Sequence, residues 1–332
     1  IKFIDDATGI MHFESNINTN MWTQSSVKYY CKWKIIVTNL KLGIENIYSL
    51  DLKNQSVKIV NDSNSLGDSI CWMAAVDKFQ KLHNCKIDYY TAKKDLFINE
   101  YPNIKFYNYG DVNSVNYCAQ YTLGCFAEEK TDLFRKDWRL QSLQEIAFSI
   151  LGSDHVESKT KITIKNKFKL NFNKYICIAT QSTSQSRYWN NDGGWTKTVD
   201  YLQELGYKVV CVDKFSSFGS QGFINASPSN INYFAGHHSF DEIIDIINGC
   251  EFFIGLSSGL SWLAWACELP VVLISGFSEK WAETTLDTYR VINENVCHGC
   301  FNRSRLDAGD WNWCPDHKDT QRQFECSKEI SS

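Results

Sequence analysis

The second half of the chain repeats one pattern: a short apolar run, a polar or glycine-containing loop, and a longer amphipathic stretch. Short apolar runs favour buried strands, and longer stretches with apolar residues three or four positions apart favour helices. Strands that alternate with helices build a parallel sheet with helices on its faces, so we predict a Rossmann-like α/β unit here. The predicted strands are 175–179, 208–212, 252–255 and 271–274, and the predicted helices are 195–205, 240–247 and 259–267.

The same alternation begins earlier in the chain, with predicted strands 57–60, 87–90 and 104–107 and predicted helices 68–82 and 140–151. A lysine-rich segment, 159–174, separates the two halves. Before residue 56, polar and apolar side chains alternate in short runs between turn residues, which is typical of a small β module. We therefore predict a β module at 1–55, a Rossmann-like domain at 56–158 and a second Rossmann-like domain at 159–332.

The composition excludes several functional classes. A net charge of -4 and a pI near 6.0 lack the basic surface that a nucleic-acid binder needs. The apolar stretch 252–277 is interrupted by Glu268 and Pro270, so we expect a buried helix and strand there instead of membrane insertion. The 13 cysteines, an odd number spread through apparent core segments, favour reduced thiols and a cytoplasmic location.

Asp68 is the leading catalytic candidate. It ends the polar loop 64–68, which follows the first predicted α/β strand at the edge where open sheets bind ligands. Its carboxylate could cap the following helix by accepting amide protons. It could also face the cleft and take a proton from an acceptor hydroxyl as that oxygen attacks a sugar carbon. The sequence leaves both roles open, and they can coexist.

Two loops of the second half suit a diphosphate. Loop 180–189 combines hydroxyl side chains with one cation, Arg187, whose planar guanidinium can pair with phosphate oxygens. Turn 255–261 joins a buried strand to a helix whose free amides can bind an anion. The alternatives are a solvated polar loop and a turn kept small for packing. No Asp-x-Asp sequence occurs in the chain, so we predict that Arg187 and the helix dipole, without a metal ion, offset the diphosphate charge.

Near the C-terminus a Cys-x-x-Cys pair is followed by two separate cysteines, within segment 295–328. Four thiolates can close a tetrahedral metal site, and zinc would satisfy them. His298 and His317 are possible substitute ligands, and a redox dithiol or unrelated buried thiols are the alternatives. We predict a structural metal finger whose ligands are Cys297, Cys300, Cys314 and Cys326.

These motifs together resemble a known family. Segment 64–68 with its helix, the Ser186–Trp189 loop and segment 253–266 are similar to the ADP-heptose heptosyltransferases of the GT-B fold, across roughly residues 57–290. The added β module and four-cysteine finger resemble more narrowly the bacterial autotransporter heptosyltransferases. Those enzymes glycosylate serines on autotransporter adhesins in the cytoplasm. The resemblance implies a GT-B fold, ADP-heptose as donor and an adhesin as acceptor.

The resemblance also implies residue roles and an assembly. Asp68 matches the general base, and Arg187 matches a basic residue, usually lysine, that neutralises the donor diphosphate. The remaining implied donor contacts are Ser182, Thr183, His238, Ser258, Gly259 and Leu260, with His238 near the adenine. Two positions depart from the family, since Ser257 replaces an acidic residue and Trp262 a histidine. The family further implies iron in the finger and a large ring-like homo-oligomer, a dodecamer.

The sequence hypothesis is therefore an inverting transfer of heptose from ADP-heptose to serine hydroxyls of an autotransporter adhesin. One alternative is transfer of heptose to the lipopolysaccharide core. The other is a non-catalytic protein that binds a nucleotide sugar or docks an adhesin, which the departures at Arg187 and Ser257 keep open.

Overall fold

The computed structural model describes residues 1–125 and 135–332, which form two compact units. One unit comprises residues 1–64 and 72–156, and the other comprises residues 65–71 and 157–332. The sequence predicted three parts, 1–55, 56–158 and 159–332, and that division stays a prediction. In the described ranges, no helix has the length and apolar character needed to cross a bilayer.

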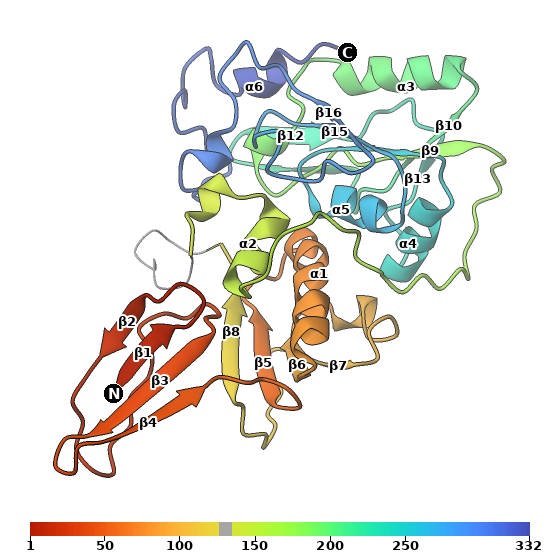
Figure 1. The fold of residues 1–332 in the computed structure, drawn as a ribbon. Coiled ribbons are helices and arrows are strands. Elements are labelled where there is room, and N and C mark those ends of the chain that lie inside the picture. The colour runs from red at the N-terminus through yellow and green to blue at the C-terminus, as the bar shows by residue number, and fades with distance from the viewer. Residues whose placement is uncertain (126–134) are drawn as a thin grey trace. The chain divides into compact units, whose positions relative to one another are not determined.

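The first unit contains an antiparallel sheet built by the N-terminal residues, drawn in red to orange in Figure 1. Its strand order is β2-β1-β3-β4. Burial alternates along β1, whereas every residue of β4 is exposed, so only part of this sheet is packed. Their bounds are β1 Lys2–Asp5, β2 Met11–Glu14, β3 Trp33–Asn39 and β4 Ile44–Ser49.

The first unit also contains a four-stranded parallel sheet of order β7-β6-β5-β8. Val57 and Ile59 of its central strand are fully buried, so the face that they share lies in the core. Helix α2 packs near β8, and the Trp72 ring nitrogen of α1 donates to the carbonyl oxygen of Leu143 in α2. The bounds are β5 Ser56–Asn61, β6 Lys86–Tyr90, β7 Ile104–Tyr107, β8 Ala119–Leu123, α1 Leu66–His83 and α2 Leu143–Ile150.

The second unit is built on a six-stranded parallel sheet of order β13-β10-β9-β14-β15-β16. Helix α3 covers one face, and α4 and α5 cover the other (Figure 1). This order, 3-2-1-4-5-6, is that of doubly wound α/β sheets. The bounds are β9 Tyr175–Ile178, β10 Lys208–Cys211, β13 Tyr233–Phe234, β14 Phe253–Gly255, β15 Val271–Ile274, β16 Thr288–Val291, α3 Gly194–Glu204, α4 Phe240–Asn248 and α5 Gly259–Ala266.

The predicted α/β alternation is confirmed, with element ends shifted by one to three residues. Helix α1 begins at Leu66, so the prediction that it begins at Asp68 was wrong by two residues. Strands β8, β13 and β16 were not predicted, and neither was a hairpin of β11, Ser217–Ser220, and β12, Phe223–Ala226. The predicted linker 159–174 contains no helix or strand. The chain ends with a short helix, α6, at Glu325–Lys328.

Candidate active site and cysteine cluster

The two predicted phosphate loops follow adjacent strands of the second sheet. Loop 180–189 follows β9 and turn 255–259 follows β14, and these strands pair with each other. Strand order reverses between them, because β10 and β13 extend the sheet on one side and β15 and β16 on the other. Open α/β sheets bind ligands at the carboxyl ends of strands at such a switch point.

Arg187 ends a short 3-10 helix, Gln185–Arg187, inside the first loop. Its guanidinium lies 4.7 Å from the centre of the Phe277 ring. Among the described residues, it makes neither a hydrogen bond nor an ion pair, and its Nε is buried without a partner. Burial lowers the pKa of Arg187, and Glu283 and Asp68 oppose that shift through their charges. A guanidinium stays protonated in proteins, so this half-buried cation offers its charge to an anion.

Two of the predicted donor-binding hydroxyls, like Arg187 Nε, are buried without a hydrogen-bond partner among the described residues. The Oγ atoms of Ser182 and Ser258 are buried and have no hydrogen-bond partner in the part of the chain that is described. Buried hydroxyls normally find a partner, so these atoms mark a place that a polar ligand can fill. Thr183 is exposed, and Gly259 and Leu260 are half-buried at the start of α5.

The first turn of α1 packs against the turn before α5. A Cβ atom added to Gly67 would lie 2.8 Å from the Trp262 ring, and one added to Gly259 would lie 2.7 Å from Cβ of Leu66. Only glycine permits these approaches. Asp68 lies half-buried in the first turn of α1, which begins at Leu66, so both roles considered for its carboxylate stay open. A carboxylate in this turn still interacts favourably with the helix dipole.

The loop that carries Arg187 is anchored by a buried carboxylate. Asp213 accepts hydrogen bonds from the backbone amide and hydroxyl of Thr180, at 2.7 and 2.8 Å, and from the amide of Gln181 at 3.2 Å. Burial raises the pKa of Asp213, and these hydrogen bonds oppose the shift. Further along, the backbone amide of Gln185 donates to the carbonyl oxygen of Trp311 at 2.9 Å. These hydrogen bonds fix the backbone of the loop, whereas Ser182 Oγ and Arg187 Nε have no partner among the described residues.

A buried ion pair beside the second turn was not predicted. Glu283 Oε2 accepts hydrogen bonds from Arg290 Nη1 and Ser257 Oγ, each at 2.6 Å, and from Ser278 Oγ. The side chains of Arg290 and Glu283 are 8% and 10% exposed, so the pair lies in the interior. Burial alone would raise the pKa of Glu283, but Arg290 and the two hydroxyls hold it below its ordinary value. Ser257, where the family usually has an acid, thus contacts a carboxylate from elsewhere in the chain.

His238, the predicted adenine contact, lies just before α4. Its Nε2 is 2.8 Å from the Tyr233 hydroxyl, and its Nδ1 is 3.5 Å from a carboxylate oxygen of Glu242. Its ring packs 4.4 Å from that of Phe168, measured between centres. Within residues 1–125 and 135–332, no hydrogen bond or ion pair joins His238 to Arg187.

The four predicted finger cysteines line one cavity of about 20 Å³. That volume exceeds the roughly 10–15 Å³ that a single water molecule requires, so one metal ion would fit. Burial, together with the nearby Cys314 and Cys297 thiols, raises the pKa of Cys326 to about 12. Burial likewise raises the pKa of Cys300, together with Cys326, Cys314 and Cys297. The four predicted cysteines therefore line one cavity, and their role as metal ligands stays a prediction.

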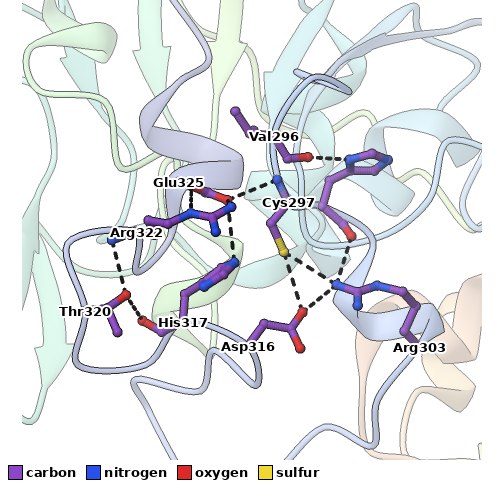
Figure 2. Close-up of polar contacts among 9 residues, drawn as sticks. Val296, Cys297, Arg303, Asp316, His317, Thr320, Arg322 and Glu325 are labelled. Carbon is purple, nitrogen blue, oxygen red and sulfur yellow. Dashed lines mark hydrogen bonds and ion pairs between the residues drawn. The ribbon is translucent and has the colours of Figure 1, made fainter.

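Paired charges surround the Cys297 corner of this cavity (Figure 2). Arg303 lies 3.5 Å from Cys297 Sγ and 2.7 Å from a carboxylate oxygen of Asp316. Glu325 Oε1 accepts from the Cys297 amide at 3.1 Å and from Arg322 at 2.6 Å. Ligand atoms of Cys297, His317 and Glu325 lie within 4.8 Å of one another, so a mixed ligand set is an alternative to four thiolates.

Comparison with known proteins identifies the family. Residues 127–303 match the family model glycosyltransferase family 9 (heptosyltransferase). The chain is 37% identical over 339 residues to the autotransporter heptosyltransferase Aah of Escherichia coli. This alignment covers 100% of this chain and 85% of Aah. It is also 32% identical over 340 residues to BimC of Burkholderia thailandensis, named an inactive autotransporter heptosyltransferase, covering 100% of this chain and 78% of BimC.

A solved structure is similar throughout. The iron-containing dodecameric glycosyltransferase TibC from enterotoxigenic E. coli superposes with a TM-score of 0.92 at 34% identity. The match covers 99% of this chain and 87% of TibC. TibC has also been solved in complex with ADP-D-β-D-heptose. The chain is therefore a glycosyltransferase of family 9, the heptosyltransferases, and belongs within it to the autotransporter heptosyltransferases.

Proposed function

We propose that this protein transfers heptose from ADP-heptose to serine hydroxyls of an autotransporter adhesin, with inversion at the anomeric carbon. The observation that carries the proposal is the half-buried, unpaired guanidinium of Arg187 beside the switch point of the second sheet. A poorly solvated cation that forms no ion pair is costly, and a diphosphate would supply a direct partner. The complex of TibC with ADP-D-β-D-heptose supports this choice of ligand.

In the proposed reaction, one set of groups binds the donor diphosphate and Asp68 acts on the acceptor serine. The donor diphosphate would lie between Arg187, the hydroxyls of Ser182 and Ser258, and the free amides of α5, so that these groups stabilise the charge of the departing ADP. Asp68, whose charge acts on Arg187, would take the proton from the attacking serine. An ordinary carboxylate is a weak base for a hydroxyl, so the proton moves late, as the new bond forms. Binding and orientation then supply much of the rate.

We assign the GT-B fold to the chain as part of the same proposal. Each unit contains a parallel α/β sheet, and TibC, with a TM-score of 0.92, supports a common fold. In such an arrangement the 56–158 domain would receive the acceptor, and the 159–332 domain would hold the donor.

We also propose that segment 295–328 holds one structural iron ion through Cys297, Cys300, Cys314 and Cys326. The shared cavity of these thiols and the iron-containing character of TibC support this assignment. Thiolate ligands suit iron as well as zinc. The ion would cross-link three parts of this one segment, while His317 and Glu325 beside Cys297 would help to orient the ligands.

We propose assembly into a large ring-like homo-oligomer, a dodecamer, in the cytoplasm. The dodecameric state of TibC supports the assembly. Exposed apolar side chains on β4 and on the β11–β12 hairpin, including Ile44, Ile47 and Ile224, offer surfaces that subunit contacts would cover. The 13 thiols, all free of disulfides in the described structure, support a reducing compartment.

A second candidate function is favoured by one comparison. BimC, which aligns with the whole of this chain, is named inactive. A protein of this fold could therefore bind a donor or an adhesin without transferring sugar. Donor binding without transfer to any adhesin fragment would favour that function.

The proposed reaction is tested by measuring ADP release with a coupled assay. The protein is incubated with ADP-heptose and a passenger fragment of an autotransporter, or with the same fragment in which every serine is alanine. We expect release of ADP only with the serine-containing fragment. Equal release from both fragments would rule out serine as acceptor, and binding without release would favour the non-catalytic function.

A further inference from the structure

We propose that Glu283 recognises the sugar of the donor, by accepting a hydrogen bond from one of its hydroxyls through Oε1. This inference rests on the proposed donor function and adds a specificity-determining residue to it. Three observations carry it: the uneven use of the two carboxylate oxygens, the position of Glu283 relative to Arg187, and the fixed geometry of the turn that Glu283 contacts.

The two oxygens of Glu283 differ in their surroundings. Oε2 accepts from Arg290, Ser257 and Ser278, whereas Oε1 accepts no hydrogen bond from any residue of the described ranges. Arg290 Nη2 also donates to the carbonyl oxygen of Ser278 at 2.8 Å, so the guanidinium and carboxylate are locked in place. The side chain is nine-tenths buried. A carboxylate has acceptor sites on both oxygens, so Oε1 is left for a partner outside the chain.

Glu283 lies beside the proposed donor site, because it accepts a hydrogen bond from Ser257 and the next residue is Ser258, whose unpartnered hydroxyl would bind the donor. Its charge also acts on Arg187, as does that of Asp68. The sugar links the diphosphate, which Arg187 would bind, to the carbon whose attacking hydroxyl Asp68 would deprotonate. Glu283 therefore lies near the diphosphate–sugar end of the donor.

The chemistry of Glu283 selects a hydroxyl as its partner. The pKa of Glu283 is below its ordinary value, so the group is an anion at neutral pH and only accepts hydrogen bonds. An anion repels phosphate oxygens, but it forms strong charge-assisted bonds with neutral hydroxyls. Arg290 offsets the charge of Glu283, so the carboxylate can lie close to a diphosphate without preventing its binding.

The test compares two ligands, ADP and ADP-heptose, by titration calorimetry. In Glu283→Gln, the amide oxygen would turn toward Arg290 and leave the NH₂ group at the Oε1 position, where it cannot accept a hydroxyl proton. We expect affinity for ADP-heptose to fall about tenfold or more, since hydrogen bonds to charged groups are strong. Affinity for ADP, which lacks the sugar, should change less than about twofold.

The exposed acid Glu294, paired with Lys280, provides the matched control: Glu294→Gln should leave both affinities unchanged. If Glu283→Gln does not fold because Arg290 loses its partner, the double variant Glu283→Gln, Arg290→Met removes both charges and should show the same sugar-specific loss. An equal loss of affinity for both ligands would show that Glu283 only holds the turn, and would overturn the inference. A wild-type protein that binds neither ligand would instead overturn the proposed function.

Discussion

Arginines behave in opposite ways in the two candidate sites of the second unit. In the cysteine cluster, Arg303 pairs with Asp316 at 2.7 Å and Arg322 pairs with Glu325 at 2.6 Å. In the switch-point site, Arg187 packs on Phe277 and has no ion pair among the described residues. Arg303 and Arg322 are also more accessible to water, with 46% and 61% of their side chains exposed.

This contrast separates two uses of charge. Exposed, paired charges cost little free energy and contribute little to stability, so they can surround a structural metal site. A buried cation without a partner costs stability, and the chain keeps it only where a ligand completes the pair. Arg290 combines the two cases, since its side chain is only 8% exposed and yet pairs with an acid, Glu283, as the finger arginines do.

The largest expected effect is on catalysis. Asp68→Asn removes the proposed base but keeps the shape of the side chain, so the transfer rate should fall about 10²- to 10⁴-fold. Donor affinity should stay within about twofold, because Arg187 and the α5 amides remain in place. Initial rates and calorimetric titration with ADP-heptose measure the two quantities. A variant that retains most of its turnover would remove Asp68 from the role of base.

The comparison of arginines is tested directly at Arg187. Arg187→Met should weaken ADP-heptose binding about 10- to 100-fold, because charge-assisted contacts to the diphosphate are lost. The melting temperature of the ligand-free protein should stay the same or rise, since an unpaired buried charge is removed. Arg187→Lys should retain much of the affinity. Arg303→Met, on a paired arginine, is the control that should leave donor affinity unchanged.

The cysteine cluster is tested by its metal content. Cys300→Ala should lose the bound iron and lower the melting temperature, since a structural thiolate site supplies folding free energy. Cys85→Ala, at another buried thiol outside the cluster, should keep the metal. Elemental analysis of the purified proteins measures the content. Full metal content in Cys300→Ala, combined with its loss in a His317 variant, would favour the mixed ligand set.

The smallest expected effect concerns the exposed ion pair of the finger. Arg303→Gln should lower the free energy of unfolding by only about 0–1 kcal/mol, because the pair with Asp316 is exposed to solvent. Chemical denaturation measures this change. A much larger loss would mean that the contact from Arg303 to Cys297 Sγ holds the metal site, and would weaken the contrast with Arg187.

Local sequence signals explain why most of the second unit could be predicted. Helix α4 begins with a capping box, in which Ser239 and Glu242 bond each other's backbone amides, and it was predicted to within a residue. Glycine at 206, with a positive φ of 85°, follows the end of α3 as predicted. The cysteine cluster was found because the Cys-x-x-Cys spacing is itself a local signal.

Non-local features were missed for a physical reason. Ser257 and Glu283 lie 26 residues apart, and only the sheet brings the turn after β14 near the segment before β16. No local pattern marks Glu283 as part of a site. The start of α1 was misplaced by two residues because the polar residues 64–68 suggested a loop, whereas the helix begins at Leu66.

The central claim is most directly tested by the intact mass of a passenger fragment after incubation with this protein and ADP-heptose, beside the Asp68→Asn variant. We predict repeated mass increases of one heptose with the wild type, and none with the variant. An unchanged mass with the wild type, in the presence of measurable ADP-heptose binding, would contradict the claim that this site transfers heptose to an adhesin.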